Sequence, residues 1–114
     1  MKIYVAGPMR GYTDFNFPAF HAASAKLRKK GHEVFSPAEK DQSIHGGDFA
    51  KGTNGTLESI ANTGFSLRRA LGDDTAWICA EGEGIYLLKG WETSKGAKAE
   101  KALAEALGLE IMYE

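Results

Sequence analysis

The spacing of hydrophobic and polar residues changes several times along this 114-residue chain. Short apolar runs predict four β-strands, at residues 3–6, 33–35, 85–88 and 109–112. Apolar residues at helical spacing predict helices at residues 18–30, 56–71 and 94–107, with a short capped helix at 73–79. Strands that alternate with helices are typical of a parallel sheet covered on both faces. We therefore predict a single α/β domain over residues 1–114, a three-layer sandwich with a mainly parallel sheet of about four to five strands.

One stretch of the chain has no hydrophobic period. Residues 40–55 are polar and contain four glycines. A connection of this length exceeds what most compact domains use between elements. We expect it to form either a mobile lid or a disordered surface loop.

The loops after the predicted strands are the first candidates for a site. In a Rossmann-like sheet of this kind, ligands bind beyond the carboxyl ends of the strands. In the first such loop, Gly7 and Gly11 flank Arg10, whose guanidinium suits a phosphate or carboxylate. Taken singly, these residues are better explained by an ordinary turn and a surface arginine.

The second loop leads into the helix predicted at residues 94–107. Ser94 is placed as its N-cap, where the hydroxyl and the free N–H groups of the first turn favour an anion. Gly96 leaves room for a ligand to approach the backbone. A plain cap would look the same, but two such loops at one sheet edge favour an anion-binding site.

Glu100 breaks the pattern of its own helix. On a helical wheel it lies within the apolar stripe, between Gly96, Leu103, Ala104 and Leu107, and not among the charged residues. A carboxylate buried there must be paired, hydrogen-bonded or functional, because burying it bare costs several kcal/mol. A structural ion pair and a catalytic or ligand-binding role are both compatible with this position.

Composition and charge exclude several classes of function. The chain has 14 Lys and Arg against 15 Asp and Glu, for a net charge of −1. Binding to a nucleic-acid polymer normally requires a basic excess or stripe, so we expect no such partner. No apolar run approaches the roughly 18–20 residues of a membrane span, and the first residues suit a strand better than a signal peptide. We expect a cytoplasmic protein with no membrane partner.

Cysteine and histidine usage bears on redox and metal chemistry. The only cysteine, Cys79, excludes an internal disulfide and fits a reducing compartment, and its apolar surroundings suggest a buried, inert thiol. His21, His32 and His45 have no metal-ligand spacing with one another or with Cys79. No dinucleotide-binding or Walker-type glycine loop occurs. We expect no metal and no cofactor.

Motifs spread over nearly the whole chain, except residues 41–55, resemble one known superfamily. They are Lys2-Ile3-Tyr4-Val5-Ala6-Gly7-Pro8, then Arg10-Gly11, and Ser94-x-Gly96-x-x-x-Glu100. This set resembles the nucleoside 2-deoxyribosyltransferase superfamily, and within it the branch that hydrolyses deoxyribonucleoside 5′-monophosphates. A longer pattern is closer still to a small, mostly uncharacterised family common in phages and prophages. It adds Asp14-Phe15-Asn16, Gly31-His32-Glu33-Val34, Trp77-Ile78 and Leu88-x-Gly90-Trp91-Glu92.

The resemblance implies a catalytic role for two residues. Glu100 takes the position of the nucleophilic glutamate, which attacks the anomeric carbon of a 2-deoxyribosyl group and forms a covalent glycosyl-enzyme, as in a retaining glycosidase. Tyr4 takes the position of the tyrosine that orients the sugar and the carboxylate. The segments that contact phosphate in the family correspond here to Arg10, Gly11, Ser94 and Gly96.

Two positions depart from the family pattern. The acidic residue expected before the penultimate strand is Asp in the relatives and Glu83 here, and its longer side chain must fold back to protonate the leaving base. Asp74 is the other candidate for this general acid, although it also fits a helix cap. Tyr12 replaces the second loop glycine of the hydrolase branch, which leaves the preference for a 5′-phosphate open.

The two tryptophans have different expected places. Trp91, in a sheet-edge loop, is the better candidate to stack on a nucleobase. Trp77, beside Ile78, is expected in the core.

Three hypotheses for function follow. The leading one is an enzyme that cleaves or transfers the N-glycosidic bond of 2-deoxyribonucleosides or their 5′-monophosphates, without a cofactor. The second is a non-catalytic module that sequesters a nucleotide or a nucleotide-derived signal. The third is a small interaction protein with a decayed site. A domain this small makes a shallow cleft, so we expect a homodimer or larger homo-oligomer to complete it, in the host cytoplasm if the protein is phage-encoded.

Overall fold

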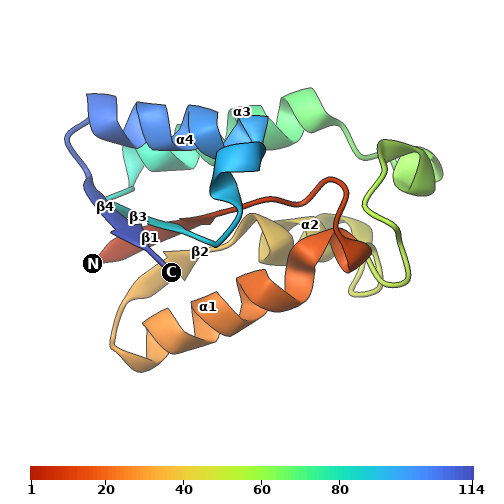
Figure 1. The fold of residues 1–114 in the computed structure, drawn as a ribbon, viewed down its shortest axis with the longest axis horizontal. Helices are drawn as coiled ribbons and strands as arrows, with labels where there is room; N and C mark the ends of the chain where they lie inside the picture. The colour runs from red at the N-terminus through yellow and green to blue at the C-terminus, as the bar shows by residue number, and fades with distance from the viewer.

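Four parallel strands form the sheet at the centre of the molecule, in the order β2-β1-β3-β4 (Figure 1). The computed structural model describes all residues from 1 to 114. The strands are β1 (Lys2–Ala6), β2 (Glu33–Phe35), β3 (Gly84–Leu87) and β4 (Glu110–Tyr113). The prediction of a mainly parallel sheet of about four to five strands is confirmed, since all four strands are parallel, and each strand lies within one residue of its expected bounds.

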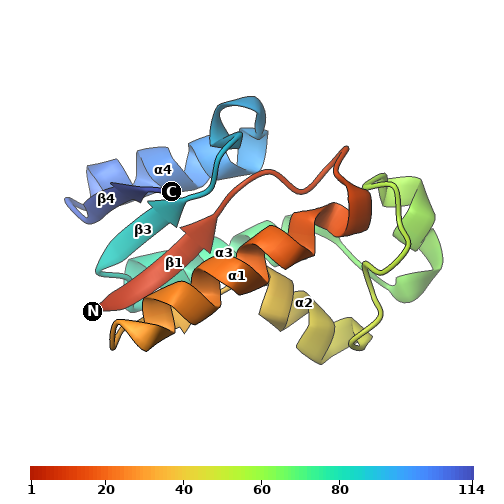
Figure 2. The same cartoon turned by 60° about the horizontal axis from the view of Figure 1, so that its bottom comes forward.

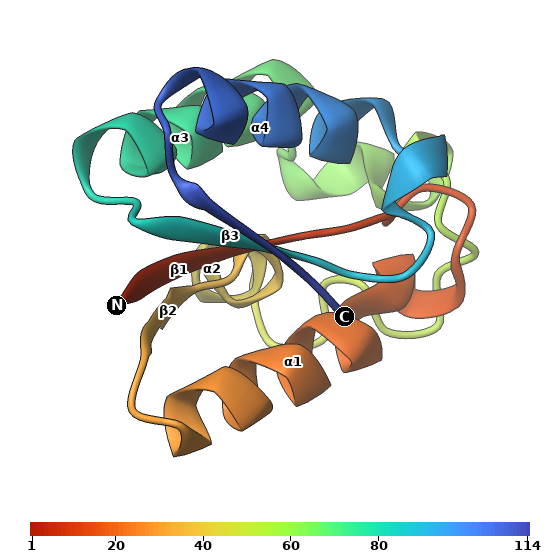
Figure 3. The same cartoon turned by 60° about the vertical axis from the view of Figure 1, so that its left-hand side comes forward.

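Helices cover both faces of the sheet. In Figures 1 and 3, α3 (Leu67–Ala80) and α4 (Lys95–Ala106) lie on one side, and α1 (Phe17–Lys29) and α2 (Pro37–His45) lie on the other. The predicted three-layer α/β sandwich is therefore confirmed. None of these helices combines the length and the hydropathy that crossing a bilayer requires.

The central strand β1 divides the core into two parts. Ile3 and Val5 point into the layer that contains α1, whereas Tyr4 and Ala6 point into the layer of α3 and α4. None of the four is more than 1% exposed. This alternation follows from the two-residue period of a strand, and it aims Tyr4 towards α4.

The expectation of a loop throughout residues 40–55 is wrong for its first part. Residues 40–45 belong to α2, which begins with Pro37, and Phe49 and Ala50 in the following turns are buried in the core on the α1 side. Proline suits the first turn of a helix because it needs no hydrogen bond there. The helix was missed because its nine residues present only a narrow buried face, too short to show a period.

The helices predicted between residues 56 and 79 divide differently. Thr56 does cap a helix, but it is a 3₁₀ helix at Leu57–Thr63 that stops at Gly64, where φ is +82°. α3 then starts at Leu67. Its N-cap is Ser66, whose side chain accepts a hydrogen bond from the N–H of Arg69. Asp74 was considered as a helix cap in the sequence analysis. It instead lies in the middle of α3 and caps no helix.

The prediction for the cysteine is also wrong, because Cys79 is exposed. It lies near the end of α3, on the side of the helix away from the buried Ile78. The apolar run 76–79 suggested burial, but on a helix adjacent residues point in directions about 100° apart, so only one side of such a run packs on the sheet.

β1 and β3 run side by side to the same end of the molecule (Figure 2). The loop after β1, the segment between α2 and α3, and the start of α4 gather at this end. Gly7 packs directly on Leu88, because a Cβ at Gly7 would lie 2.7 Å from the Cβ of Leu88. The close approach of these two loops forms one wall of the candidate site.

Candidate functional site

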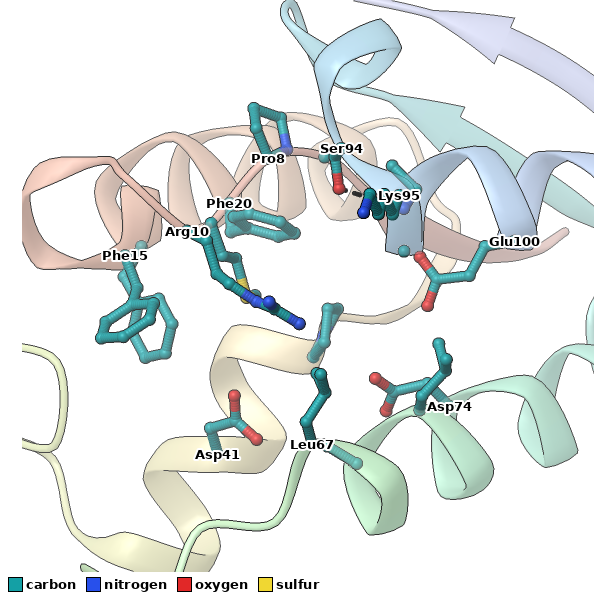
Figure 4. Close-up of a pocket in the computed structure, with 18 of the residues that line it drawn as sticks. Pro8, Arg10, Phe15, Phe20, Asp41, Leu67, Asp74, Ser94, Lys95 and Glu100 are labelled. Carbon is teal, nitrogen blue, oxygen red and sulfur yellow. Dashed lines mark hydrogen bonds between the residues drawn. The ribbon is translucent and has the colours of Figure 1, made fainter. Parts of the chain in front are cut away.

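A cavity of about 350 Å³ opens at the carboxyl end of β1 (Figure 4). Its walls come from the loop after β1, from α2, from the turns between α2 and α3, and from the first turns of α3 and α4. This is the position at which parallel α/β sheets bind their ligands. The volume lies in the range of pockets for small molecules such as a nucleoside or nucleotide.

A buried hydrogen bond joins Tyr4 and Glu100 at one end of this cavity. The hydroxyl of Tyr4 donates to Oε2 of Glu100 over 2.6 Å. Glu100 is 6% exposed and lies on the buried side of α4 with Ala97 and Ala104, as the helical wheel predicted. Oε1 of Glu100 has no hydrogen-bond partner within the chain, and the side chain lines the cavity. One carboxylate oxygen is thus fixed by Tyr4 and the other is available to a ligand.

Burial dominates the electrostatics of this pair. The pKa of Glu100 is raised to about 8, chiefly by burial and also by the charge of Asp74, and the hydrogen bond from Tyr4 limits the rise. Burial and the neighbouring Glu100 also raise the pKa of Tyr4 well above its usual value. Tyr4 therefore keeps its proton throughout the physiological range and remains a donor.

Asp74 and Lys40 form an ion pair beside Glu100. Nζ of Lys40 lies 3.0 Å from Oδ1 of Asp74 and 3.6 Å from Oδ2 of Asp73. The same ammonium donates to the carbonyl of Ala70, so that it links α2 to α3. Burial raises the pKa of Asp74, and the hydrogen bond and charge of Lys40 limit the rise. Asp74, predicted as one of two possible general acids, does lie in the cavity.

Asp41 is a third carboxylate in the cavity, and the sequence analysis missed it. It is 6% exposed, and no hydrogen bond or ion pair within the chain reaches its side chain. Burial and the charge of Asp74 raise its pKa to about 7. The sequence feature that could have revealed it is Ser36-Pro37, which is typical of a helix start and would place Pro37, Ala38 and Asp41 on one face. No three acidic, histidine or cysteine side chains lie close enough together to hold a metal ion.

The groups suited to an anion lie elsewhere in the cavity. Arg10 lines it from the loop after β1, and its guanidinium has no hydrogen bond or ion pair within the chain. Ser94 caps α4 as predicted, with its hydroxyl accepting from the N–H of Ala97 over 3.1 Å. Gly96 and Gly7 also line this part. The predicted anion-binding loops are therefore brought together at one cavity.

Three of the predicted site residues lie outside the cavity. Glu83 is at the opposite edge of the sheet, where its carboxylate accepts from the backbone N–H of Lys2 over 2.7 Å. The structure thus separates Glu83 from Glu100 by the length of the strands, and of the two predicted general acids only Asp74 lines the cavity. Gly11 donates its N–H to the carbonyl of Gly55 and does not line the cavity.

Trp91 is the third residue outside the cavity. Its ring packs near Tyr113, with centroids 6.0 Å apart, and Nζ of Lys101 lies 5.2 Å from its centroid. It lines a separate shallow depression and cannot stack on a base held near Glu100. Trp77 is half-buried against the core, stacked on Phe35 at 5.0 Å, in agreement with its expected place.

The segment Asp14-Phe15-Asn16 has an unusual backbone. All three residues have positive φ, of 54°, 52° and 62°, which is unfavourable for residues with a side chain. Asp14 holds this conformation by accepting from the N–H of Gly52, and Asn16 by donating to the carbonyl of Pro8. The result is that Phe15 is buried in the cavity wall. Strained segments held in this way concentrate at ligand-binding sites.

Comparison with known proteins gives one match. The model of the family described as Domain of unknown function (DUF4406) matches residues 1–113. The chain belongs to this family. The match covers every element that lines the cavity, and the family description assigns no activity. No curated protein and no solved structure matched the chain.

Proposed function

We propose that this protein cleaves or transfers the N-glycosidic bond of 2-deoxyribonucleosides or their 5′-monophosphates, through a covalent intermediate on Glu100. The observation that carries the proposal is the buried hydrogen bond from Tyr4 to Glu100, which leaves Oε1 facing a cavity that also contains Asp74. A carboxylate nucleophile with a second carboxyl group beside it is the arrangement used by retaining glycosidases. The motifs that resemble the deoxyribosyltransferases include both Tyr4 and Glu100.

The first step breaks the bond between the sugar and the base. Oε1 of Glu100 attacks C1′ of the deoxyribose, and the electron pair of the C1′–N bond passes to the base. Asp74 donates the proton that neutralises the departing base, which requires that it be protonated beforehand. Burial raises the pKa of Asp74 towards this state, whereas the ion pair with Lys40 opposes it, so the proton must be taken up against that pairing.

The second step frees the sugar from Glu100. A water molecule or a second base attacks C1′, Asp74 accepts the proton that the attacking group loses, and the C1′–O bond to Glu100 breaks. The hydroxyl of Tyr4 stabilises the carboxylate that this step regenerates, because it donates to the oxygen not used in the attack. Two displacements at C1′ retain its configuration.

Separation of reaction products tests this proposal directly. Each deoxynucleoside and deoxynucleoside 5′-monophosphate is incubated with the protein, with and without a free base, and the released or exchanged base is separated by chromatography. Product formed with water alone indicates hydrolysis, and product that needs the added base indicates transfer. The absence of product from every substrate would overturn the enzyme proposal.

Arg10 is the group expected to hold a 5′-phosphate. Its guanidinium lines the cavity without a partner, and the N-terminus of α4 provides N–H groups at the same site. Arg10→Gln should raise KM for a 5′-monophosphate by about tenfold to a hundredfold, because a charge-assisted hydrogen bond is lost, and change KM for the free nucleoside little.

The matched control for this prediction is Arg68→Gln, since Arg68 is exposed and does not line the cavity. It should leave both KM values unchanged. Equal losses for nucleoside and monophosphate in Arg10→Gln would contradict a phosphate-binding role.

One observation favours the alternative, a binding module without turnover. With the pKa of Glu100 at about 8, most molecules carry it as the neutral acid at pH 7, and a neutral acid is a poor nucleophile. A binder would retain affinity for nucleotides and give no product in the chromatographic experiment.

The proposed site also requires a second subunit. Leu57 and Leu67 line the cavity and are 39% and 43% exposed, which leaves an apolar rim open to solvent. We expect light scattering after size-exclusion chromatography to show a homodimer or larger homo-oligomer at micromolar concentration. A monomer under these conditions would contradict the expectation.

A cytoplasmic location is part of the proposal, since a single cysteine fits a reducing compartment.

A further inference from the structure

The cavity has two ends with different chemistry. The N-terminus of α4, with Ser94, forms the end that attracts anions, and the side chain of Arg10 reaches into the middle of the cavity (Figure 4). Asp41 lies across the cavity from Ser94 (Figure 4). A carboxylate repels phosphate, so the part of a nucleotide that meets Asp41 is not its 5′ end.

The wall near Asp41 is aromatic. His45 follows Asp41 by one helical turn on α2 and stacks on Phe49 with ring centroids 4.8 Å apart. Phe49 in turn packs near Phe15 and Phe65, with centroids 6.5 and 5.7 Å away, and all three phenylalanines line the cavity. A flat aromatic ligand such as a nucleobase fits walls of this kind.

Asp41 itself lacks a partner. It is more than nine-tenths buried, it lines the cavity, and no donor within the chain reaches its carboxylate. Its neighbour Lys40 is turned to Asp73 and Asp74 instead. Because buried polar groups are almost always hydrogen-bonded in native proteins, an unpaired one that faces a cavity points to a donor on the ligand.

We propose that Asp41 determines base specificity, by accepting a hydrogen bond from an exocyclic amino group and so selecting amino-substituted over oxo-substituted nucleobases. This inference rests on the proposed function in that it needs a nucleobase in the cavity, but it does not need turnover. A carboxylate accepts and does not donate, so an oxo group facing it is repelled and leaves a buried charge unpaired.

The selection should depend on pH. Asp41 shares the cavity with Tyr4 on β1, Arg10 after it, Asp74 on α3, and Lys95 and Glu100 on α4, and it adjoins Lys40 on α2. Its pKa lies near 7, so it loses its proton as pH rises from 6 to 8. Below pH 7 the neutral acid can also donate to an oxo group, and the preference for an amino group should therefore increase with pH.

Binding to a variant that cannot turn over tests this inference. In the Glu100→Gln background, calorimetric titrations compare the 5′-monophosphates of deoxycytidine with deoxyuridine, and of deoxyadenosine with deoxyinosine, at pH 6 and pH 8. Each pair differs by an amino or oxo group at one position and by the adjacent ring nitrogen, which accepts in the amino-substituted base and carries a proton in the oxo-substituted one. We expect at least one amino-substituted ligand to bind about tenfold more tightly than its oxo counterpart at pH 8, and the ratio to be smaller at pH 6.

Adding Asp41→Asn should bring this ratio close to one, because a carboxamide can present either a donor or an acceptor. Asp48→Asn is the matched control, since Asp48 is exposed and does not line the cavity, and it should leave the ratio unchanged. A ratio near one in the parent, or a ratio that Asp41→Asn leaves intact, would overturn the role of Asp41 and leave the proposed function standing. Failure of all four ligands to bind would overturn the proposed function itself.

Discussion

Glu100→Gln should abolish turnover, with kcat lower by at least about a thousandfold. Glutamine has nearly the same shape and can still accept the hydrogen bond from Tyr4, but its amide does not attack C1′. Affinity for the nucleotide should change little, because the carbonyl oxygen of the amide remains in place. Chromatography of the released base measures the rate, and calorimetry measures the affinity.

The same substitution should stabilise the fold above neutral pH. Burial raises the pKa of Glu100 from its ordinary 4.5 to about 8 in the folded protein, so between these values the folded state binds more protons than the unfolded state. The contribution of Glu100 to the free energy of unfolding is therefore greatest below pH 4.5 and declines as pH rises to about 8. Glutamine does not titrate, and we expect the variant to be more stable than the parent by about 5 kcal/mol at pH 8.5.

Urea unfolding at pH 5, 7 and 8.5 measures this difference, which should increase with pH. Glu105→Gln is the matched control, because Glu105 is on the same helix with an exposed side chain that is paired only with Lys101. Its effect should stay within about 0.5 kcal/mol at every pH. Turnover that survives in Glu100→Gln would exclude the covalent mechanism, and a stability difference independent of pH would exclude a raised pKa.

Gly55→Ala should destabilise the protein by about 2–4 kcal/mol. Gly55 has φ +79°, and a Cβ there would lie 2.5 Å from both the backbone N and O of Tyr12. These atoms cannot move independently, because the carbonyl of Gly55 accepts from the N–H of Gly11 over 2.9 Å. The substitution should therefore also displace the loop that carries Arg10 and weaken nucleotide binding.

Gly52→Ala separates the cost of placing a side chain at positive φ from the cost of the steric clash with Tyr12. Gly52 has nearly the same φ, +77°, but open space where the Cβ would lie, so it reports the cost of the conformation alone. We expect that cost to be about 1 kcal/mol, with little effect on binding. Thermal unfolding with and without ligand measures both variants. Equal losses at the two positions would mean that the contact between residues 55 and 12 is not rigid.

Most of the strands and helices could be predicted from the local spacing of apolar residues. The strand at 33–35 and the start and end of α1 are encoded by neighbours, through apolar spacing, Pro18 and Gly31. The failures fall between residues 36 and 80. There α2 is too short to show a period, and the stop at Gly64 interrupts an apolar spacing that continues on both sides of it.

The candidate site was only partly accessible from the sequence. Glu100 could be found because one charge within an apolar stripe is a local anomaly, and Ser94 because a helix cap is a local motif. Asp41 is marked in the sequence only by the helix start at Ser36-Pro37, and its place in the cavity depends on α3, which is distant in sequence. Glu83 was misplaced because its position before β3 does not reveal that it bonds to Lys2 at the far edge of the sheet.

By itself, the sequence determined the layers, the parallel sheet and the edge at which a ligand would bind, because these follow from short-range periodicity and from the geometry common to parallel sheets. Only the tertiary structure decided which acids share the cavity. The pairing of Tyr4 with Glu100 spans 96 residues, and that of Lys40 with Asp74 spans 34. The strength of such pairs depends on burial and distance in space, and neither is encoded in the local spacing of residues.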